Sequence, residues 1–298
     1  NVYLNSYCIK DALDMGADIV LCGRVTDPGL SLGPMLHEFN WVSSDYDKLA
    51  SGTLAGHIIE CGAQCTGGNY SRWKEVDTFV NIGYPIINMY EDGTFYISKP
   101  PNTGGLINKY TILEQVLYEM GDPENYISPD VIVDFTSFSI KEEDNKVYIK
   151  NVKGKKATDT YKVSMSYLSG YKATGQLTIV GQDSYKKAVK ISEIIFSRLK
   201  NKGLVFEETN SEYLGHSSCS KNMFDEKINS KETVLRISVK DFDKNKIEQF
   251  TKELAPVITN GPPGITGFSG GRPKIQNIIA YWPTLIAKNL IKSRVNLL

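Results

Sequence analysis

The stretch SGTLAGHIIECGAQCTGGNY, residues 51–70, brings together one of the three histidines, a carboxylate and two of the five cysteines of the chain. The spacing of its apolar residues predicts a helix over about residues 46–61. Within that helix Gly52 and Gly56 lie four residues apart on one face, where the absence of side chains lets another backbone approach closely. We therefore expect this helix to pack tightly at the centre of its domain.

The end of the same helix carries ionisable side chains. His57, Glu60 and Cys61 follow one another at i, i+3 and i+4, so they project to one side just before the chain turns at Gly62. Two interpretations stay open at this point. In one, His57 is a hydrogen-bonded core histidine and the cysteines fill space. In the other, the cluster is a catalytic site in which His57 or Glu60 transfers protons.

The glycine-rich segment that follows favours the second interpretation. Its polar and small residues form a predicted loop next to the helix end, and backbone amides in such loops can bind an oxyanion. A second loop of this kind combines a lysine with two prolines and two glycines at residues 99–105. The residues that we consider substrate-binding candidates in these two loops are Thr66, Gly67, Gly68, Asn69, Lys99, Thr103, Gly104 and Gly105. A plain connector is the alternative for residues 99–105.

On the amino-terminal side, residues 4–15 read as an amphipathic helix and residues 18–22 as a buried strand. A strand followed directly by Gly23-Arg24-Val25-Thr26-Asp27-Pro28 has the pattern of a βα unit, whose helix we expect over residues 29–38. Ligands commonly lie beyond the carboxyl end of such a strand. Arg24 and Asp27 are therefore candidates for substrate binding and catalysis, unless they pair with each other to stabilise the turn.

The second half of the chain has a different order of elements. After charged turns at residues 141–146 and 153–156, the pattern reads strand, helix, strand, strand, helix, strand. We expect an α/β fold with a helix-flanked sheet domain over residues 1–156, followed by an α+β ferredoxin-like βαββαβ domain over residues 157–298. A long glycine- and proline-rich loop at 259–273 interrupts the second domain, and its Arg272 could bind a phosphate.

Composition limits the classes of function. The chain has 298 residues, 41% hydrophobic and 23% charged, with a formal net charge of zero. This balance provides no field that would attract nucleic acid, and the apolar runs are too short for a membrane helix. Five cysteines without a regular framework indicate reduced thiols and a cytoplasmic protein. The start at Asn1, without Met or a signal sequence, leads us to expect a fragment or a processed product.

Several motifs resemble those of the acyclic terpene utilisation (AtuA) family, and they occur in the same order along nearly the whole chain. The matching stretches are residues 23–27, 37–39, 51–57, 60–64, 66–69, 99–105, 121–123, 129–131, 134–136 and 259–262. Family members resembling this chain begin with a further α/β segment that includes a glycine-rich start. The resemblance thus agrees with a fragment that lacks this segment, and we expect the absent segment to hold part of the active site.

The resemblance implies a pathway rather than a reaction, namely the breakdown of citronellol- and geraniol-type compounds through branched acyl-CoA thioesters. We expect an enzyme that performs hydratase- or lyase-type acid/base chemistry on a CoA thioester or a related acid. His57, Glu60 and Asp27 are the catalytic candidates, and Arg24 and Arg272 would bind carboxylate or phosphate. One alternative is a non-catalytic subunit or scaffold of a catabolic enzyme complex, and another is a metal-dependent hydrolase or lyase.

The remaining expectations concern ligands and partners. No cofactor is expected, because neither a Walker motif nor a GxGxxG motif occurs in these residues. The expected partners are a small-molecule substrate and either further copies of the chain or a partner subunit, with no nucleic acid and no membrane. Finally, we expect the turn at residues 24–27, the helix end at His57 and the two glycine loops to meet at one cleft.

Overall fold

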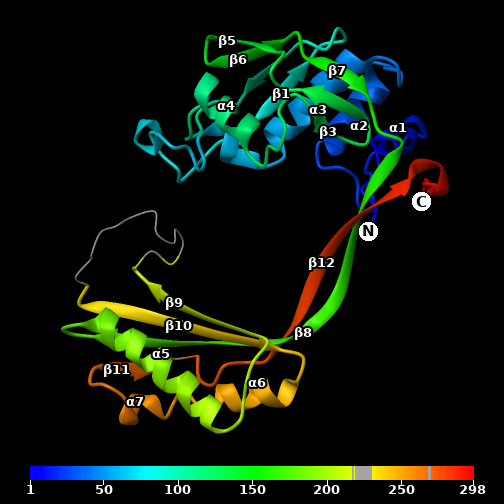
Figure 1. Cartoon of the computed structure of the whole chain (residues 1–298). Helices are drawn as coiled ribbons and strands as arrows, with labels where there is room; N and C mark the ends of the chain where they lie inside the picture. Colours follow the sequence, from blue (N-terminus) through cyan, green and yellow to red (C-terminus); the bar gives the residue numbers. More distant parts are fainter. Residues whose placement is uncertain (217, 219–229, 268–269) are drawn as a thin grey trace. The chain divides into compact units, whose positions relative to one another are not determined.

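A computed structural model of the chain describes residues 1–216, 218, 230–267 and 270–298 (Figure 1). The chain divides into two compact units. The first unit comprises residues Asn1–Met165 and Pro283–Leu298, and the second unit comprises Ser166–Trp282. The division thus begins shortly after the boundary predicted at residue 156, and the last residues of the chain return to the first unit.

Helix α3, Tyr46–Ile59, forms the centre of the first unit. Its residues from Leu49 to Ile58 are all buried, as expected for a helix that is enclosed on every side. It packs against α2 (Gly29–Glu38), α4 (Lys109–Leu117), and the strands β4 and β7. The stretch singled out in the sequence therefore lies in the main hydrophobic core of this unit.

The glycine pair of α3 faces α2 and the residue before it. A β-carbon added to Gly52 would lie 2.6 Å from Leu32 Cδ1, and one added to Gly56 would lie 2.5 Å from the carbonyl oxygen of Pro28. Both distances are shorter than any real side-chain contact, so only glycine lets the two helices approach this closely. The close approach predicted for this face is confirmed.

Two antiparallel sheets flank the helices of the first unit. One has the strand order β1-β2-β6-β5 and the other the order β3-β4-β7. Their bounds are β1 Ile86–Met89, β2 Phe95–Ser98, β3 Tyr126–Ile127, β4 Val131–Asp134, β5 Ser139–Glu143, β6 Lys146–Lys150 and β7 Lys153–Lys156. Short 3-10 turns lie at η1 Gly62–Thr66, η2 Trp73–Glu75 and η3 Lys288–Leu290. The combination of helices with sheets confirms the predicted α/β class.

The strand predicted at residues 18–22 is wrong. Helix α1, Tyr7–Asp14, is followed by an irregular segment in which Ile19 is 89% and Leu21 98% exposed. A strand needs a neighbour for its backbone hydrogen bonds, and among the described residues the pairing lies further on, in a parallel bridge between Leu4 and Val25. The predicted βα unit is therefore absent here, although α2 has the expected bounds.

The second unit combines one antiparallel sheet with helices. Its strand order is β11-β8-β10-β9, and β12 also pairs with β8. Helices α5 and α6 both pack against β10 and run along the same face of the sheet (Figure 1). The bounds are β8 Thr160–Val180, α5 Ser184–Asn201, β9 Glu208–Leu214, β10 Glu232–Asp241, α6 Lys244–Thr251, α7 Val257–Asn260, β11 Ile265–Gly267 and β12 Gln276–Ala287.

A second hydrophobic core lies between this sheet and its helices. Ala173, Leu177 and Ile179 of β8 alternate with exposed or half-buried residues, and they face Ile191 and Ile195 of α5. This period of two in the strand and the apolar stripe on the helix are the patterns that the sequence showed. The ferredoxin-like identity of the second unit stays a prediction.

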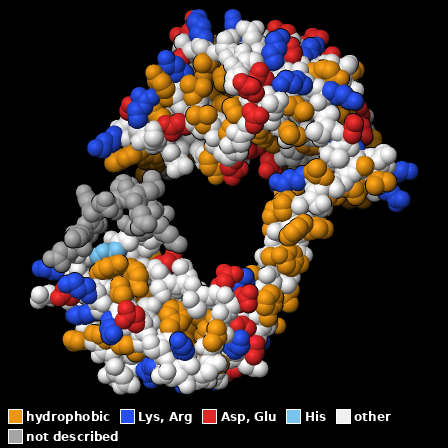
Figure 2. All heavy atoms as spheres, in the orientation of Figure 1, with side chains coloured by type: hydrophobic (Ala, Val, Ile, Leu, Met, Phe, Trp, Pro, Cys, Tyr) orange, Lys and Arg blue, Asp and Glu red, His pale blue; other side chains and the backbone are white. Residues whose placement is uncertain are grey.

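The surface of each unit carries charges of both signs. Figure 2 shows Lys and Arg side chains interspersed with Asp and Glu on the visible face of each unit, in agreement with a formal net charge of zero. Among the described residues, no helix has both the length and the apolar content that crossing a membrane requires. The cytoplasmic location stays a prediction.

Candidate functional site

His57 lies in the last turn of α3 and is only 1% exposed. Its Nε2 is 3.3 Å from the carbonyl oxygen of Val116, and its Nδ1 is 3.1 Å from Oε1 of Glu60. A carbonyl oxygen can only accept, so Nε2 carries a proton. The contact at Nδ1 also needs one proton, held either by the imidazole or by the carboxyl group. His57 and Glu60 therefore form a hydrogen-bonded pair in which His57 is buried and Glu60 is partly exposed.

Aromatic rings surround this pair. The imidazole lies 5.5 Å from the ring of Tyr126 and 5.4 Å from the ring of Phe135, and the latter two rings stack at 4.7 Å. Oε2 of Glu60 is buried without a hydrogen-bond partner among the described residues. His57 thus has the hydrogen bonds of the core histidine in the first interpretation, but it adjoins a carboxylate that is not fully satisfied.

Tyr126 connects the pair to the surface. Burial raises the pKa of its phenol, and the charges of Glu60 and Asp27 raise it further. Because this electrostatic effect requires proximity, both carboxylates lie near the phenol. The structure therefore gathers the three catalytic candidates, His57, Glu60 and Asp27, around a tyrosine that the sequence analysis did not single out.

A pocket of about 530 Å³ opens beside Tyr126 within the first unit. We call it the first-unit pocket. It lies where the amino-terminal segment, the turn before α2, β3 and the two strands β8 and β12 come together. Its polar lining includes Asp27, Thr26, Ser128, Thr158, Thr160 and Lys162. Apolar walls with a few converging polar groups are typical of small-molecule sites.

Arg24 lies close to the mouth of this pocket. Its guanidinium forms an ion pair with Asp27, with Nη1 at 2.9 Å from Oδ1, and lies 4.3 Å from the centroid of the Tyr3 ring. The ammonium of Lys162 is 5.1 Å from the same centroid. Arg24 and Asp27 thus pair with each other, as the alternative interpretation proposed. Asp27 also lines the pocket and is half-exposed, so it remains accessible to a ligand.

The two glycine loops lie next to each other. The amide of Leu106 donates to the carbonyl of Thr66 over 2.8 Å, and the Thr66 hydroxyl donates to the carbonyl of Gly83 over 2.5 Å. The amide of Gly83 in turn donates to the carbonyl of Gly104 over 3.0 Å. None of the loop candidates is among the residues that line the first-unit pocket.

The predicted oxyanion role of these loops does not fit the structure. The amides of Gly67, Gly68, Gly104 and Gly105 all donate to backbone carbonyls, those of Gln64, Ala63, Asn81 and Thr78 respectively. Lys99 donates to the carbonyl of Thr103 over 2.7 Å, inside its own loop. Thr66 is buried and Asn69 is exposed with a positive φ of 57°. The loops thus satisfy their own polar groups, and substrate binding by their side chains stays a prediction.

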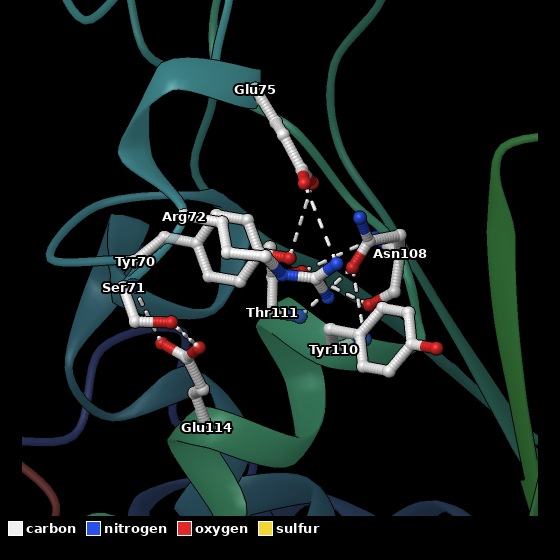
Figure 3. Close-up of polar contacts among 8 residues, drawn as sticks. All are labelled: Tyr70, Ser71, Arg72, Glu75, Asn108, Tyr110, Thr111 and Glu114. Atoms are coloured by element: carbon white, nitrogen blue, oxygen red, sulfur yellow. Dashed lines mark hydrogen bonds and ion pairs between the residues drawn. The ribbon is translucent and has the colours of Figure 1, made fainter.

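A polar cluster fixes the end of the first loop to α4 (Figure 3). The guanidinium of Arg72 lies 4.1 Å from the ring centroid of Tyr110 and 5.4 Å from that of Tyr70, and it forms an ion pair with Glu75 at 3.4 Å. Figure 3 shows the Arg72 side chain between the two rings. The cluster thus attaches residues 70–75, which follow the glycine loop, to the first turn of α4.

The first turn of α4 supports this arrangement. The side chain of Asn108 accepts from the amides of Tyr110 and Thr111, and the Thr111 hydroxyl accepts from the amide of Asn108, which completes a capping box. One helical turn later, Glu114 accepts from the amide of Ser71 over 3.0 Å (Figure 3). These contacts explain why the loop is ordered.

The other predicted groups lie elsewhere. Arg272 is exposed in the second unit, where it lines a different pocket, and residues 268–269 of its loop lie outside the described residues. His37 pairs with Asp14, with Nδ1 at 2.6 Å from Oδ1. No group of three or more His, Cys, Asp or Glu side chains within the described ranges is arranged to hold a metal ion.

Four cysteines are free thiols, namely Cys8, Cys22, Cys61 and Cys65. Cys219 lies outside the described residues, so the expectation of five free thiols stays a prediction. Burial raises the pKa of the Cys65 thiol to about 12. Cys65 is therefore uncharged at neutral pH and fills space in the core.

Comparison with known proteins identifies the family. The model of the acyclic terpene utilisation family protein AtuA matches residues 1–297. The chain belongs to this family. No curated protein and no solved structure matches it.

Within this AtuA-family chain, sequence reasoning missed the residues that form the pocket around Asp27. Tyr126 follows a turn with no distinctive motif, while Thr158, Thr160 and Lys162 belong to what looked like a charged connection and an ordinary strand. The available signals were the matching stretches at residues 121–123 and 129–131, which lie on either side of Tyr126. Position in the fold, rather than local pattern, brings these residues to the pocket.

Proposed function

We propose that this AtuA-family protein is an enzyme of acyclic terpene or branched acyl-CoA breakdown that uses acid/base chemistry on a CoA thioester or a related acid. The first-unit pocket is the proposed substrate site. The observation that carries this proposal is the position of Asp27, which lines the pocket together with Tyr126, whose ring lies 5.5 Å from that of His57.

The proposed roles follow from exposure and charge. Asp27 is the catalytic candidate in contact with the pocket, so it would take a proton from the substrate or return one to it. Tyr126 keeps its proton at neutral pH because its pKa is raised, and it can donate a hydrogen bond to a substrate oxygen. Lys162 would bind a carboxylate or phosphate group at the edge of the pocket.

His57 and Glu60 act from behind Tyr126 in this proposal. Neither residue lines the first-unit pocket, so they would position the phenol and respond to charge that develops in the pocket, rather than contact the substrate. The pathway comes from family membership, while hydratase- or lyase-type chemistry is the class that a carboxylate and a phenol can perform without a cofactor.

The test is turnover of a panel of branched and linear acyl-CoA esters, followed by mass spectrometry. Asp27→Asn should lower the rate by about 100-fold or more, because the amide cannot exchange a proton. Asp11→Asn is a matched control, since Asp11 is an exposed carboxylate of the first unit outside the pocket. Equal rates for Asp27→Asn and the unchanged protein would rule out Asp27 as the catalytic group.

A second candidate function is that of a non-catalytic subunit. Large apolar side chains are almost fully exposed in the first unit, namely Ile19 at 89%, Leu21 at 98% and Val80 at 96%. Where such side chains form a contiguous patch, they often mark a protein interface. Light scattering of the protein should show a mass above that of one chain if copies associate through them, and Leu21→Ser together with Val80→Ser should then restore the monomer.

A further inference from the structure

The second unit contains a cavity of about 750 Å³ that the proposed reaction does not use. We call it the second-unit pocket. It lies between residues 174–177 of β8, the end of α6, α7, and residues 267 and 270–274. Its volume falls within the range of roughly 300–1,000 Å³ that small-molecule sites occupy.

The charged side chains that line this pocket are all positive. Lys252, Arg272 and Lys274 line the pocket, and no Asp or Glu is among the described residues that do so. Lys252 forms an ion pair with Glu248 over 2.7 Å at the surface of α6. Arg272 and Lys274 follow the glycines of the loop and remain as the cationic side of the pocket. An anionic group placed there gains attraction from both.

The other side of the pocket is apolar. Leu177 and Leu254 are 2% and 5% exposed and belong to the core of the second unit. Ala255 and Ile258 continue this wall toward the surface, where Ile258 is 38% exposed. A ligand carbon chain that covered Ile258 would remove apolar surface from water, which favours binding by about 25 cal/mol per Å².

We propose that the second-unit pocket binds an amphipathic anion. The carbon chain lies against Leu254 and Ile258, and the anionic head, either a carboxylate or a phosphate ester, lies at Arg272 and Lys274. Both cations are exposed, and the charge of Arg272 also acts on Glu248, whose pKa is lowered chiefly by Lys252 and further by Arg272. A purely polar anion would leave the apolar wall in contact with water, and an uncharged chain would gain no attraction from the two cations. This binding is independent of the chemistry proposed for the first-unit pocket.

Isothermal titration of the full chain with octyl phosphate, octanoate, octanol and inorganic phosphate tests the inference. At least one of the two amphipathic anions should bind about tenfold more tightly than octanol and than inorganic phosphate. The comparison of octyl phosphate with octanoate then identifies the head group. Octanol binding as tightly as both anions would overturn the inference, and so would inorganic phosphate binding as tightly as octyl phosphate.

Variants locate the site. Arg272→Gln combined with Lys274→Gln should weaken binding of the preferred anion about tenfold and reduce its dependence on salt, and Ile258→Ala should weaken it about fivefold. Lys200→Gln removes one exposed charge from the same unit outside the pocket, and Lys162→Gln removes the cation of the first-unit pocket. Lys200→Gln should bind normally, and in Lys162→Gln the binding that depends on Arg272 and Lys274 should persist.

The result that overturns this assignment is unchanged affinity in the double variant, or loss of binding in Lys162→Gln. The second outcome would place the anion in the first-unit pocket. Turnover measurements on the Asp27→Asn variant are separate from these titrations, so failure of one proposal leaves the other standing.

Discussion

His57, one of the catalytic candidates, also makes contacts that stabilise the core of the first unit. Its two ring nitrogens contact Val116 and Glu60, and its ring lies against Tyr126 and Phe135. Removing such a side chain takes away a hydrogen bond and leaves a cavity in the core. His57 therefore contributes to the stability of the first unit.

We predict that His57→Ala lowers the free energy of unfolding of the first unit by about 2–3 kcal/mol. Urea unfolding followed by the fluorescence of Trp41, which is 2% exposed in the first-unit core, measures this change. His37→Ala is the matched control, because its side chain is 39% exposed. Similar losses for both variants would show that the contacts of His57 contribute little.

Asp130 is a second buried ionisable residue of the first unit. It is 8% exposed and accepts hydrogen bonds from the amide and the hydroxyl of Ser6, at 2.9 and 3.0 Å. Burial raises its pKa from 3.8 to about 6, although the Ser6 bonds and Lys288 act in the opposite direction. Its charge in turn contributes to the raised pKa values of Tyr7 and Tyr161.

A raised carboxyl pKa makes the folded state bind a proton more tightly than the unfolded state. The resulting contribution to stability is complete below pH 4 and disappears as the pH rises through about 6. Asp130→Asn should remove this dependence, so that the variant gains about 2–3 kcal/mol relative to the unchanged protein between pH 4 and pH 7.5. Urea unfolding at the two pH values measures the difference.

Asp134 provides a control of opposite sign. The hydroxyl and amide of Thr136 hold the pKa of this exposed carboxyl below its usual value, so its contribution is lost as the pH falls. Asp134→Asn should therefore not gain stability between pH 4 and pH 7.5 relative to the unchanged protein. If Asp130→Asn and Asp134→Asn change in the same direction, burial does not control the protonation of Asp130.

At this scale the sequence identified residue types better than their surroundings. His57, Glu60 and Asp27 were named from spacing and from a turn, and the structure gathers them around Tyr126. The hydrogen-bond partners of these side chains could not be predicted. The partner of His57, for example, is Val116, which lies on a distant element of the chain. The same limit applied to the glycine amides, whose acceptors depend on how the loops fold back.

At the scale of a whole element, the packing of helix α3 depends on two glycines. Gly52 and Gly56 bring it against Leu32 and Pro28. Since Pro28 also lines the first-unit pocket, the packing of α3 determines the position of one wall of that pocket.

Gly56→Ala should lower the free energy of unfolding by about 2–3 kcal/mol, because the new methyl group would lie 2.5 Å from the carbonyl oxygen of Pro28. Gly23→Ala is the matched control, since no atom lies within 4 Å of its added β-carbon. Urea unfolding compares the two variants. A gain in stability for Gly56→Ala, as at an exposed helical site, would contradict the close contact.

The helices were predictable because their signals are local. The sequence placed α2 and α3 within two residues of their observed bounds. The strands were harder to predict from the sequence. Residues 153–156 read as a charged turn but form β7, where the lysines point outward and Gly154 lies against the carbonyl of Tyr46 on α3. Because glycine is not hydrophobic, the sequence does not reveal that Gly154 packs on a helix. Residues 18–22 are the opposite case, since they are apolar but form no strand.

At the scale of the whole molecule, each unit has its own hydrophobic core. Ile58 in the first core and Ile195 in the second are both fully buried. A change in one core should therefore act mainly on the unit that contains it.

We predict that Ile58→Ala increases hydrogen exchange in α3 and β4, and that Ile195→Ala increases it in α5 and β10, with a loss of about 2–4 kcal/mol in each unit. Hydrogen exchange with mass spectrometry resolves these elements in the full chain, and each variant is the control for the other. Faster exchange in both units for either variant would show that the chain unfolds as one cooperative body.

The division of the chain also has a consequence for its biosynthesis. Residues 166–282 are inserted between two parts of the first unit, and Lys288 in the second part donates its amide to the carbonyl of Asp159 and its ammonium to that of Pro129. Because a ribosome releases residues in order, the second unit can fold before these contacts exist. The unit whose synthesis starts first is therefore completed last, when Lys288 forms its hydrogen bonds to Asp159 and Pro129.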